Sequence, residues 1–105
     1  MALTRSFRET VKDRVQRDPA FREAILLEAV EVLLSGDVQT GKALLRDFIN
    51  ATIGFDDLSR RTGTPAKSLM RMFGPKGNPA ARTLFTVIGE LQEASGVVLQ
   101  LQRAA

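Results

Sequence analysis

The stretch Phe55-Asp-Asp-Leu-Ser-Arg-Arg-Thr-Gly-Thr-Pro-Ala-Lys-Ser-Leu-Met-Arg-Met-Phe73 predicts two short helices joined by a glycine turn. Gly63 supplies the positive φ that a sharp turn between helices demands. Thr64-Pro65 has the pattern of a cap residue followed by a first-turn proline, so we expect the second helix to begin there and to end near Phe73. Three apolar residues are spaced to pack the two helices together: Leu58, Leu69 and Met72.

Charge is segregated along the chain. Residues 58–89 carry six basic residues and no acidic residue, whereas residues 1–57 carry eight basic and ten acidic residues. An acid-free basic block attracts polyanions, and nucleic acid is the commonest of them. On charge alone, a solvated basic face without a ligand is an equally good interpretation. The six residues are Arg60, Arg61, Lys67, Arg71, Lys76 and Arg82.

The composition bounds the class of protein. The chain has 105 residues, a formal net charge of +3, 44% hydrophobic residues and 26% charged residues, which is typical of one soluble globular domain. It has no cysteine, histidine, tyrosine or tryptophan, so it lacks thiolate ligands and the usual general base near neutral pH. We therefore expect no enzyme, no metal and no cofactor. No membrane-length apolar run occurs and no apolar signal core follows Met1–Phe7, so we expect a cytoplasmic protein with no membrane partner.

The rest of the chain also has mainly helical patterns. Apolar spacing and cap signals predict helices over about residues 3–17, from Asp18-Pro19 to Leu34, from Asp37 to Ile53, and from Asn78-Pro79 to a stop at Gly96. Residues 97–102 alternate in the manner of a short strand without a partner in the chain. The expected fold is all-α, with a two-helix extension (1–36), a core (37–96) and a terminal strand or tail (97–105) in one compact domain.

Two finer expectations concern burial. We expect Leu58, Leu69, Met72, Phe73, Leu84, Phe85 and Ile88 in the core. Met70 fits burial and an exposed position equally, and Arg82 could pair with Glu90 or Asp57. The helix expected from Asp18-Pro19 to Leu34 has a wide apolar face from Ile25 to Leu34. We therefore expect it to be largely buried or shared with a partner.

The segment Gly36-Asp-Val-Gln-Thr-Gly-Lys42 matches the first part of the phosphate-binding pattern G-x-x-x-x-G-K. That chemistry needs a preceding strand and a Ser or Thr hydroxyl after the lysine to bind magnesium. Here the preceding stretch is helical and Ala43 follows Lys42. The segment is therefore interpreted as a junction between two helices.

Residues 55–73 resemble the helix-turn-helix of the lambda-repressor-like (Xre/Cro) class. The run continues as Gly74-Pro-Lys-Gly-Asn-Pro79 and later as Thr83-Leu-Phe-Thr-Val-Ile88. These features look closer still to small addiction-module antidote proteins and prophage-type regulators of bacteria. The resemblance covers about residues 40–102. It implies a helical bundle in which the second helix of the motif contacts DNA.

Carried over by position, the resemblance implies a set of DNA-facing residues. Lys67 and Arg71 are the candidates for base-edge or phosphate contacts. Many relatives have an amide side chain early in the recognition helix, where this sequence has Pro65 and Ala66. We therefore expect few direct contacts with base edges. The full candidate set is Thr64, Pro65, Ala66, Lys67, Ser68, Arg71, Lys76, Asn78, Arg60 and Arg61, with Met70 secondary and Arg82 peripheral.

The expected function is that of a sequence-specific DNA-binding transcriptional regulator, a repressor that acts as a homodimer on double-stranded DNA. The favoured version is the antitoxin of a toxin–antitoxin pair, with a small toxin protein as partner. The alternative is a protein-interaction module that uses the same fold without binding DNA. In that case, the acidic N-terminal half would be the active surface.

Overall fold

The computed structural model describes the backbone of residues 5–104 and the side chains of residues 9–104. The described chain is all-α, as expected. The expected start of the first helix near residue 3 lies outside the described residues. Six helices follow in order: α1 (Arg5–Arg17), α2 (Pro19–Leu34), α3 (Val38–Ala51), α4 (Gly54–Thr62), α5 (Ala66–Met72) and α6 (Ala81–Ser95).

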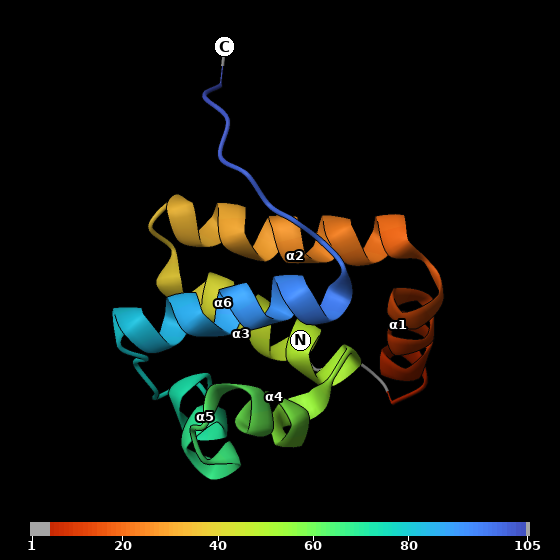
Figure 1. Ribbon diagram of the computed structural model, residues 1–105. Coiled ribbons are helices and arrows are strands. Elements are labelled where there is room, and N and C mark those ends of the chain that lie inside the picture. The colour runs from red at the N-terminus through yellow and green to blue at the C-terminus, as the bar shows by residue number, and fades with distance from the viewer. Residues whose placement is uncertain (1–4, 105) are drawn as a thin grey trace.

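Figure 1 shows α2 lying across the top of the molecule, with α3 and α6 beneath it. α1 stands at one side and packs against α2 and α3. α4 packs against α3, α5 and α6, and the α4–α5 pair forms the end of the molecule farthest from α2. The arrangement exposes α5 at one end of the bundle.

One core joins five of the helices. Phe48 and Ile49 of α3 belong to it together with Leu58 of α4, and each is at most 1% exposed. The first 36 residues contribute to the same core through α2, which buries Leu26 and Ala29 completely. The remaining members are Leu45, Phe55, Leu69, Phe73, Val87, Ile88, Leu91 and Val97.

Polar contacts define the helix ends. Asp18 caps α2 as expected, because its Oδ1 accepts the backbone N–H groups of Ala20 at 3.1 Å and Phe21 at 3.2 Å. Asp37 caps α3 by accepting the N–H of Thr40 at 3.1 Å. Gly63 ends α4 with a φ of +75°, the left-handed conformation that the sequence predicts for the turn.

Arg22 joins the C-terminal ends of α1 and α6 by hydrogen bonds. Its guanidinium donates to the carbonyl oxygen of Val15 in α1 at 3.0 Å and to that of Ser95 at the end of α6 at 3.2 Å. Both carbonyls lie in the last turn of their helix, where the partial charge is negative and a cation is favoured. The extension is therefore bonded to the C-terminal end of the fold as well as packed on it.

The strand expected over residues 97–102 is wrong. Residues 97–104 have no regular secondary structure, and the described part of the chain contains no strand with which they could pair. The segment instead packs as a tail: Val97 is buried and Leu99 is partly buried against the core. The Gln92 side chain accepts the N–H of Leu99 at 2.8 Å, so a helix side chain takes the place of a strand partner.

Burial differs from expectation at several apolar positions. Phe85 is 68% exposed, because Leu84, Val87 and Ile88 occupy the inner face of α6 and the next residue along a helix is turned by about 100°. Met72 and Leu84 are only partly buried. The second helix is not fully buried either: Leu27 is 39% exposed and Leu34 61%. Leu58, Leu69, Phe73 and Ile88 are buried as expected.

We predict that Gly41→Ala destabilises the protein. A Cβ at position 41 of α3 would lie 2.5 Å from Cγ of Leu33 in α2 and 3.1 Å from its backbone N. The free energy of unfolding, measured by urea denaturation, should fall by about 1–3 kcal/mol. Gly89→Ala is the matched control, because α6 has open space there. That change should raise stability by about 0.5–1 kcal/mol, and equal effects of the two variants would contradict this account.

The cap at Asp37 should make stability depend on pH. Hydrogen bonds from the Thr40 side chain and, second, from its backbone N–H lower the pKa of Asp37 below its ordinary value of 3.8. A lowered folded-state pKa stabilises the fold above that ordinary value, and this contribution is lost as pH falls through the folded pKa. Asp37→Asn keeps an acceptor but does not titrate. Wild type should therefore be the more stable protein at pH 6 and should lose this advantage in strong acid; a pH-independent difference would refute the assignment.

Candidate nucleic-acid interface

The helix α5 has one buried and one exposed face. Leu69 is completely buried in the core, and Ala66 and Met72 pack partly against it. On the other side Lys67 and Arg71 are exposed, and they lie one helical turn apart on the same face. Met70, for which the sequence left both positions open, is 52% exposed.

The other candidate residues surround this face. Pro65 is exposed and is the N-cap residue of α5, so the helix begins one residue later than the Thr64-Pro65 pattern predicts. Thr64, Ala66 and Ser68 are half-buried. Lys76 and Asn78 are exposed in the turn between α5 and α6. The structure therefore places these candidates on α5, immediately before it and in the turn after it.

A buried lysine holds the turn after α5. Lys42 of α3 is 3% exposed, and its Nζ donates to the carbonyl oxygen of Gly77 at 2.7 Å. Gly77 itself is pressed against the end of α5, since a Cβ there would overlap the carbonyl oxygens of Arg71 and Met72. Gln39 adds a second, longer bond from Nε2 to the carbonyl oxygen of Pro75 at 3.4 Å. The turn is therefore bonded to the first half of α3.

This role of Lys42 has no signal in the sequence. The Lys42–Gly77 bond spans 35 residues, and no local pattern links its two ends. In the sequence, Lys42 is part only of the G-x-x-x-x-G-K match. The structure agrees with the interpretation of that segment as a helix junction, because α2 precedes it and the ammonium bonds a carbonyl of the protein.

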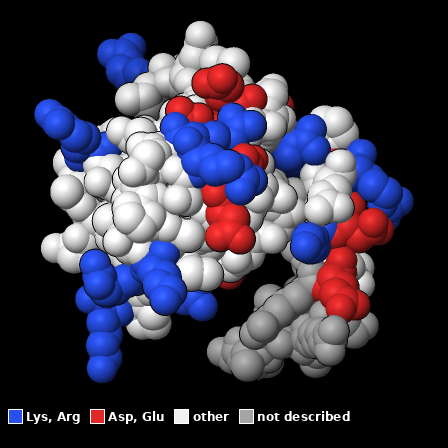
Figure 2. Space-filling model, turned by 60° about the horizontal axis from the view of Figure 1, so that its bottom comes forward, with Lys and Arg blue, Asp and Glu red and all other residues white. Residues whose placement is uncertain are grey.

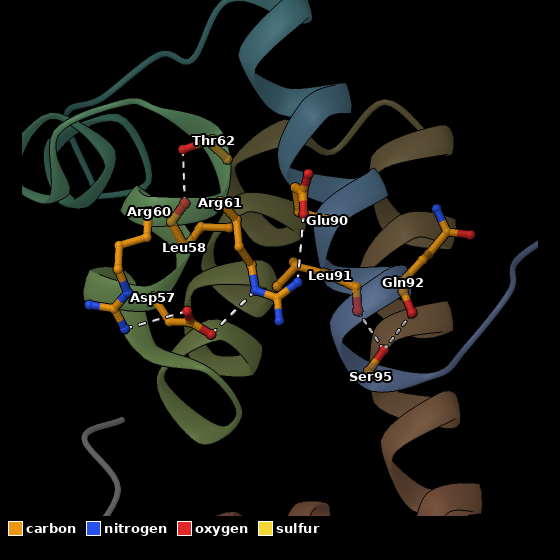
Figure 3. Close-up of polar contacts among 9 residues, drawn as sticks. All are labelled: Asp57, Leu58, Arg60, Arg61, Thr62, Glu90, Leu91, Gln92 and Ser95. Atoms are coloured by element: carbon orange, nitrogen blue, oxygen red, sulfur yellow. Dashed lines mark hydrogen bonds and ion pairs between the residues drawn. The ribbon is translucent and has the colours of Figure 1, made fainter.

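Arg61 bridges two helices (Figure 3). Its Nε lies 3.3 Å from Oδ2 of Asp57 on α4, and its Nη1 lies 3.8 Å from Oε2 of Glu90 on α6. Arg60 approaches the other oxygen of Asp57 at 3.4 Å but has a side chain that is 71% exposed, against 33% for Arg61. Arg61, not Arg82, is the residue that pairs with these two acids. Within the described residues Arg82 is exposed and has no ion pair.

Basic side chains occur across the face that Figure 2 shows, whereas acidic side chains are confined to part of it. Figure 2 views the molecule from the end formed by α4 and α5. On the left of this view, Lys and Arg surround an uncharged area and no acidic side chain is visible; Asp and Glu lie at the centre and on the right. α5 occupies the left of the molecule in Figure 1. Its surroundings therefore suit a polyanion better than the α1 side does.

Neither a membrane-spanning helix nor a metal-binding cluster occurs among the described residues. Within residues 5–104 no helix is both long and apolar enough to span a membrane. The described residues include no cluster of three or more acidic side chains arranged to hold a metal ion. Family models, curated proteins and solved structures were compared with this chain, and none matches it.

We predict that Arg61 stabilises the fold more than Arg60 does. Arg61→Ala removes two ion pairs, one of them between α4 and α6, at a half-buried position. It should lower the free energy of unfolding by about 1 kcal/mol, whereas Arg60→Ala at an exposed position should change it by less than about 0.5 kcal/mol. Thermal and urea unfolding at low and high salt measure both effects. An Arg61 effect no larger than that of Arg60 would show that the bridge contributes nothing.

Proposed function

We propose that the protein is a sequence-specific DNA-binding transcriptional regulator whose α4–α5 pair is a helix-turn-helix of the lambda-repressor-like class. The observation that carries the proposal is the two-sided character of α5. Leu69 anchors the helix in the core, while Lys67 and Arg71 are exposed on the opposite face, and residues 58–89 of the sequence include no acid. A single exposed helix of this kind fits the major groove of B-DNA.

Base readout is assigned to few residues. Lys67 and Arg71 are the side chains of α5 that can donate to guanine or to phosphate oxygens. Pro65 offers no side-chain donor or acceptor, and Ala66 offers only a methyl group for contact with a thymine methyl. With so few direct contacts, sequence preference would depend on Arg71, Lys67 and the shape of the DNA.

Phosphate contacts are assigned to exposed residues on both sides of α5. Lys76 and Asn78 follow the helix, and Arg60 precedes it on α4. Arg61 is a weaker candidate than the sequence suggested, because it is engaged by Asp57 and Glu90. A phosphate contact by Arg61 would require it to leave those partners.

We propose further that the protein acts in the cytoplasm as a homodimeric repressor. One α5 makes few base contacts, and two copies on a pseudo-palindromic site are the usual solution. The antitoxin version of this function adds a small toxin partner. The outer face of α2 would suit such a partner, because Leu27 and Leu34 are exposed there beside Glu28 and Glu31.

The second candidate function is a protein-interaction module without DNA binding. The observation that favours it is the exposure of large apolar side chains away from α5: Leu34 is 61% exposed, Val98 82% and Leu101 81%. The dependence of DNA affinity on salt separates the two functions. The DNA affinity of a DNA binder falls steeply as salt rises, whereas a flat slope of log K against log salt favours the interaction module.

We predict that Lys67→Ala and Arg71→Ala each weaken binding to the protein's own promoter DNA without lowering stability. If Arg71 contacts guanine, its loss costs about 1–3 kcal/mol and relaxes the base preference, since the competing sequences are affected less. Lys12→Ala, an exposed cation on α1, is the control that matches the change in net charge. Fluorescence anisotropy with promoter and random duplexes at two salt concentrations measures these effects. The assignment fails if Lys67→Ala and Arg71→Ala bind both duplexes as wild type does, or if Lys12→Ala weakens binding as much as they do.

A further inference from the structure

A groove separates α3 from the turn after α5. It encloses about 360 Å³ and is lined by Gln39, Lys42, Ala43 and Arg46 of α3 and by Phe73, Gly74 and Pro75. The groove begins where α5 ends, because Phe73 is the C-cap residue of that helix. It is therefore next to the candidate DNA-contacting face.

The two long basic side chains of the groove differ in role. Lys42 is almost completely buried, and its one described hydrogen bond is the 2.7 Å bond to Gly77. A buried ammonium without an acceptor is strongly destabilising, so this bond fixes the position of the turn. Arg46, one helical turn further along α3, is exposed and has no ion pair within the described residues.

The turn adds a second exposed cation. Lys76 lies between Pro75, which lines the groove, and Gly77, which accepts the bond from Lys42. An exposed lysine on a free loop would lose side-chain and backbone entropy on binding. Here the backbone on either side of Lys76 is already held by Lys42 and Gln39, so only the lysine side chain remains to be ordered.

We propose that this groove binds the DNA backbone, with Arg46 and Lys76 contacting phosphate and Lys42 acting as the positioning residue for the turn. The proposal rests on the proposed function and deepens it. It adds Arg46, which the sequence analysis did not select, to the interface and assigns Lys42 a role without DNA contact. It also makes the interface wider than α5, which offsets the small number of base contacts.

The first experiment measures the salt dependence of DNA binding for Arg46 variants of the full chain. Each neutralised phosphate contributes about −0.9 to the slope of log K against log salt. Arg46→Ala should make the slope shallower by about 0.9 and should weaken promoter and random duplexes by the same factor. Arg46→Lys, which keeps the charge, should retain most of the slope. Lys12→Ala is the control, because it makes the same change in net charge outside the groove.

The second experiment tests the positioning role by a double-mutant cycle. Lys76→Ala should reduce the slope by about 0.9 in wild type but by much less in Lys42→Met, where the turn is no longer held. If Lys42→Met does not fold, Lys42→Gln serves in the same cycle, because it removes the buried charge and shortens the donor that reaches Gly77. Amide hydrogen exchange of residues 74–79 without DNA should be faster in either background.

The outcomes separate the two proposals. If wild type binds DNA with a steep slope and Arg46→Ala behaves as Lys12→Ala does, the groove is overturned and the proposed function stands. If Lys76→Ala has the same effect in both backgrounds, the positioning role of Lys42 is overturned. If wild type shows no salt-dependent binding to any duplex, the proposed function fails and the groove proposal fails with it.

Discussion

The burial of Leu69 is the constraint on which the candidate interface depends. α5 has seven residues, and isolated helices shorter than about 12–15 residues are marginal in water. The helix therefore exists because the core accepts its inner face, with Leu69 completely buried and Ala66 and Met72 partly so. That burial decides which side of α5 faces solvent. Lys67 and Arg71 are exposed because they lie on the face of α5 opposite Leu69.

Both ends of α5 are held by different means. At the start, the left-handed Gly63 reverses the chain within three residues, between Thr62 and Ala66. At the end, Gly77 packs on the last carbonyls of α5 and its own carbonyl accepts the buried Lys42 ammonium. A buried ammonium needs a hydrogen-bond acceptor, so the bond from Lys42 fixes the position of the Gly77 carbonyl. The helix is thus held by an apolar contact with the core, and the turn that follows it is held by a charge-assisted hydrogen bond from α3.

Ion pairing explains why the number of basic residues in 58–89 overestimates the number of unpaired cations near α5. Residues 58–89 contain no acid, yet Arg61 is paired with Asp57 and Glu90, which lie just outside that block. Those acids are near in space because α4 packs on α6. The contiguous basic block of the sequence is therefore divided: Arg61 serves the fold, and Lys67, Arg71 and Lys76 remain exposed. Arg46, from the acidic half of the sequence, is exposed at the groove beside the end of α5.

Local signals were enough to predict the all-helical class, the caps at Asp18 and Asp37, the turn at Gly63 and the burial of Leu58 and Leu69. Each depends on residues within a few positions of one another: a carboxylate reaches N–H groups two or three residues later, and glycine alone adopts positive φ without strain. The tertiary structure decided the rest. Phe85 is exposed, the tail does not form a strand, and Lys42 bonds a carbonyl 35 residues away. These features depend on which faces and chain segments the packing brings together, and a linear pattern carries no information about contacts at that distance.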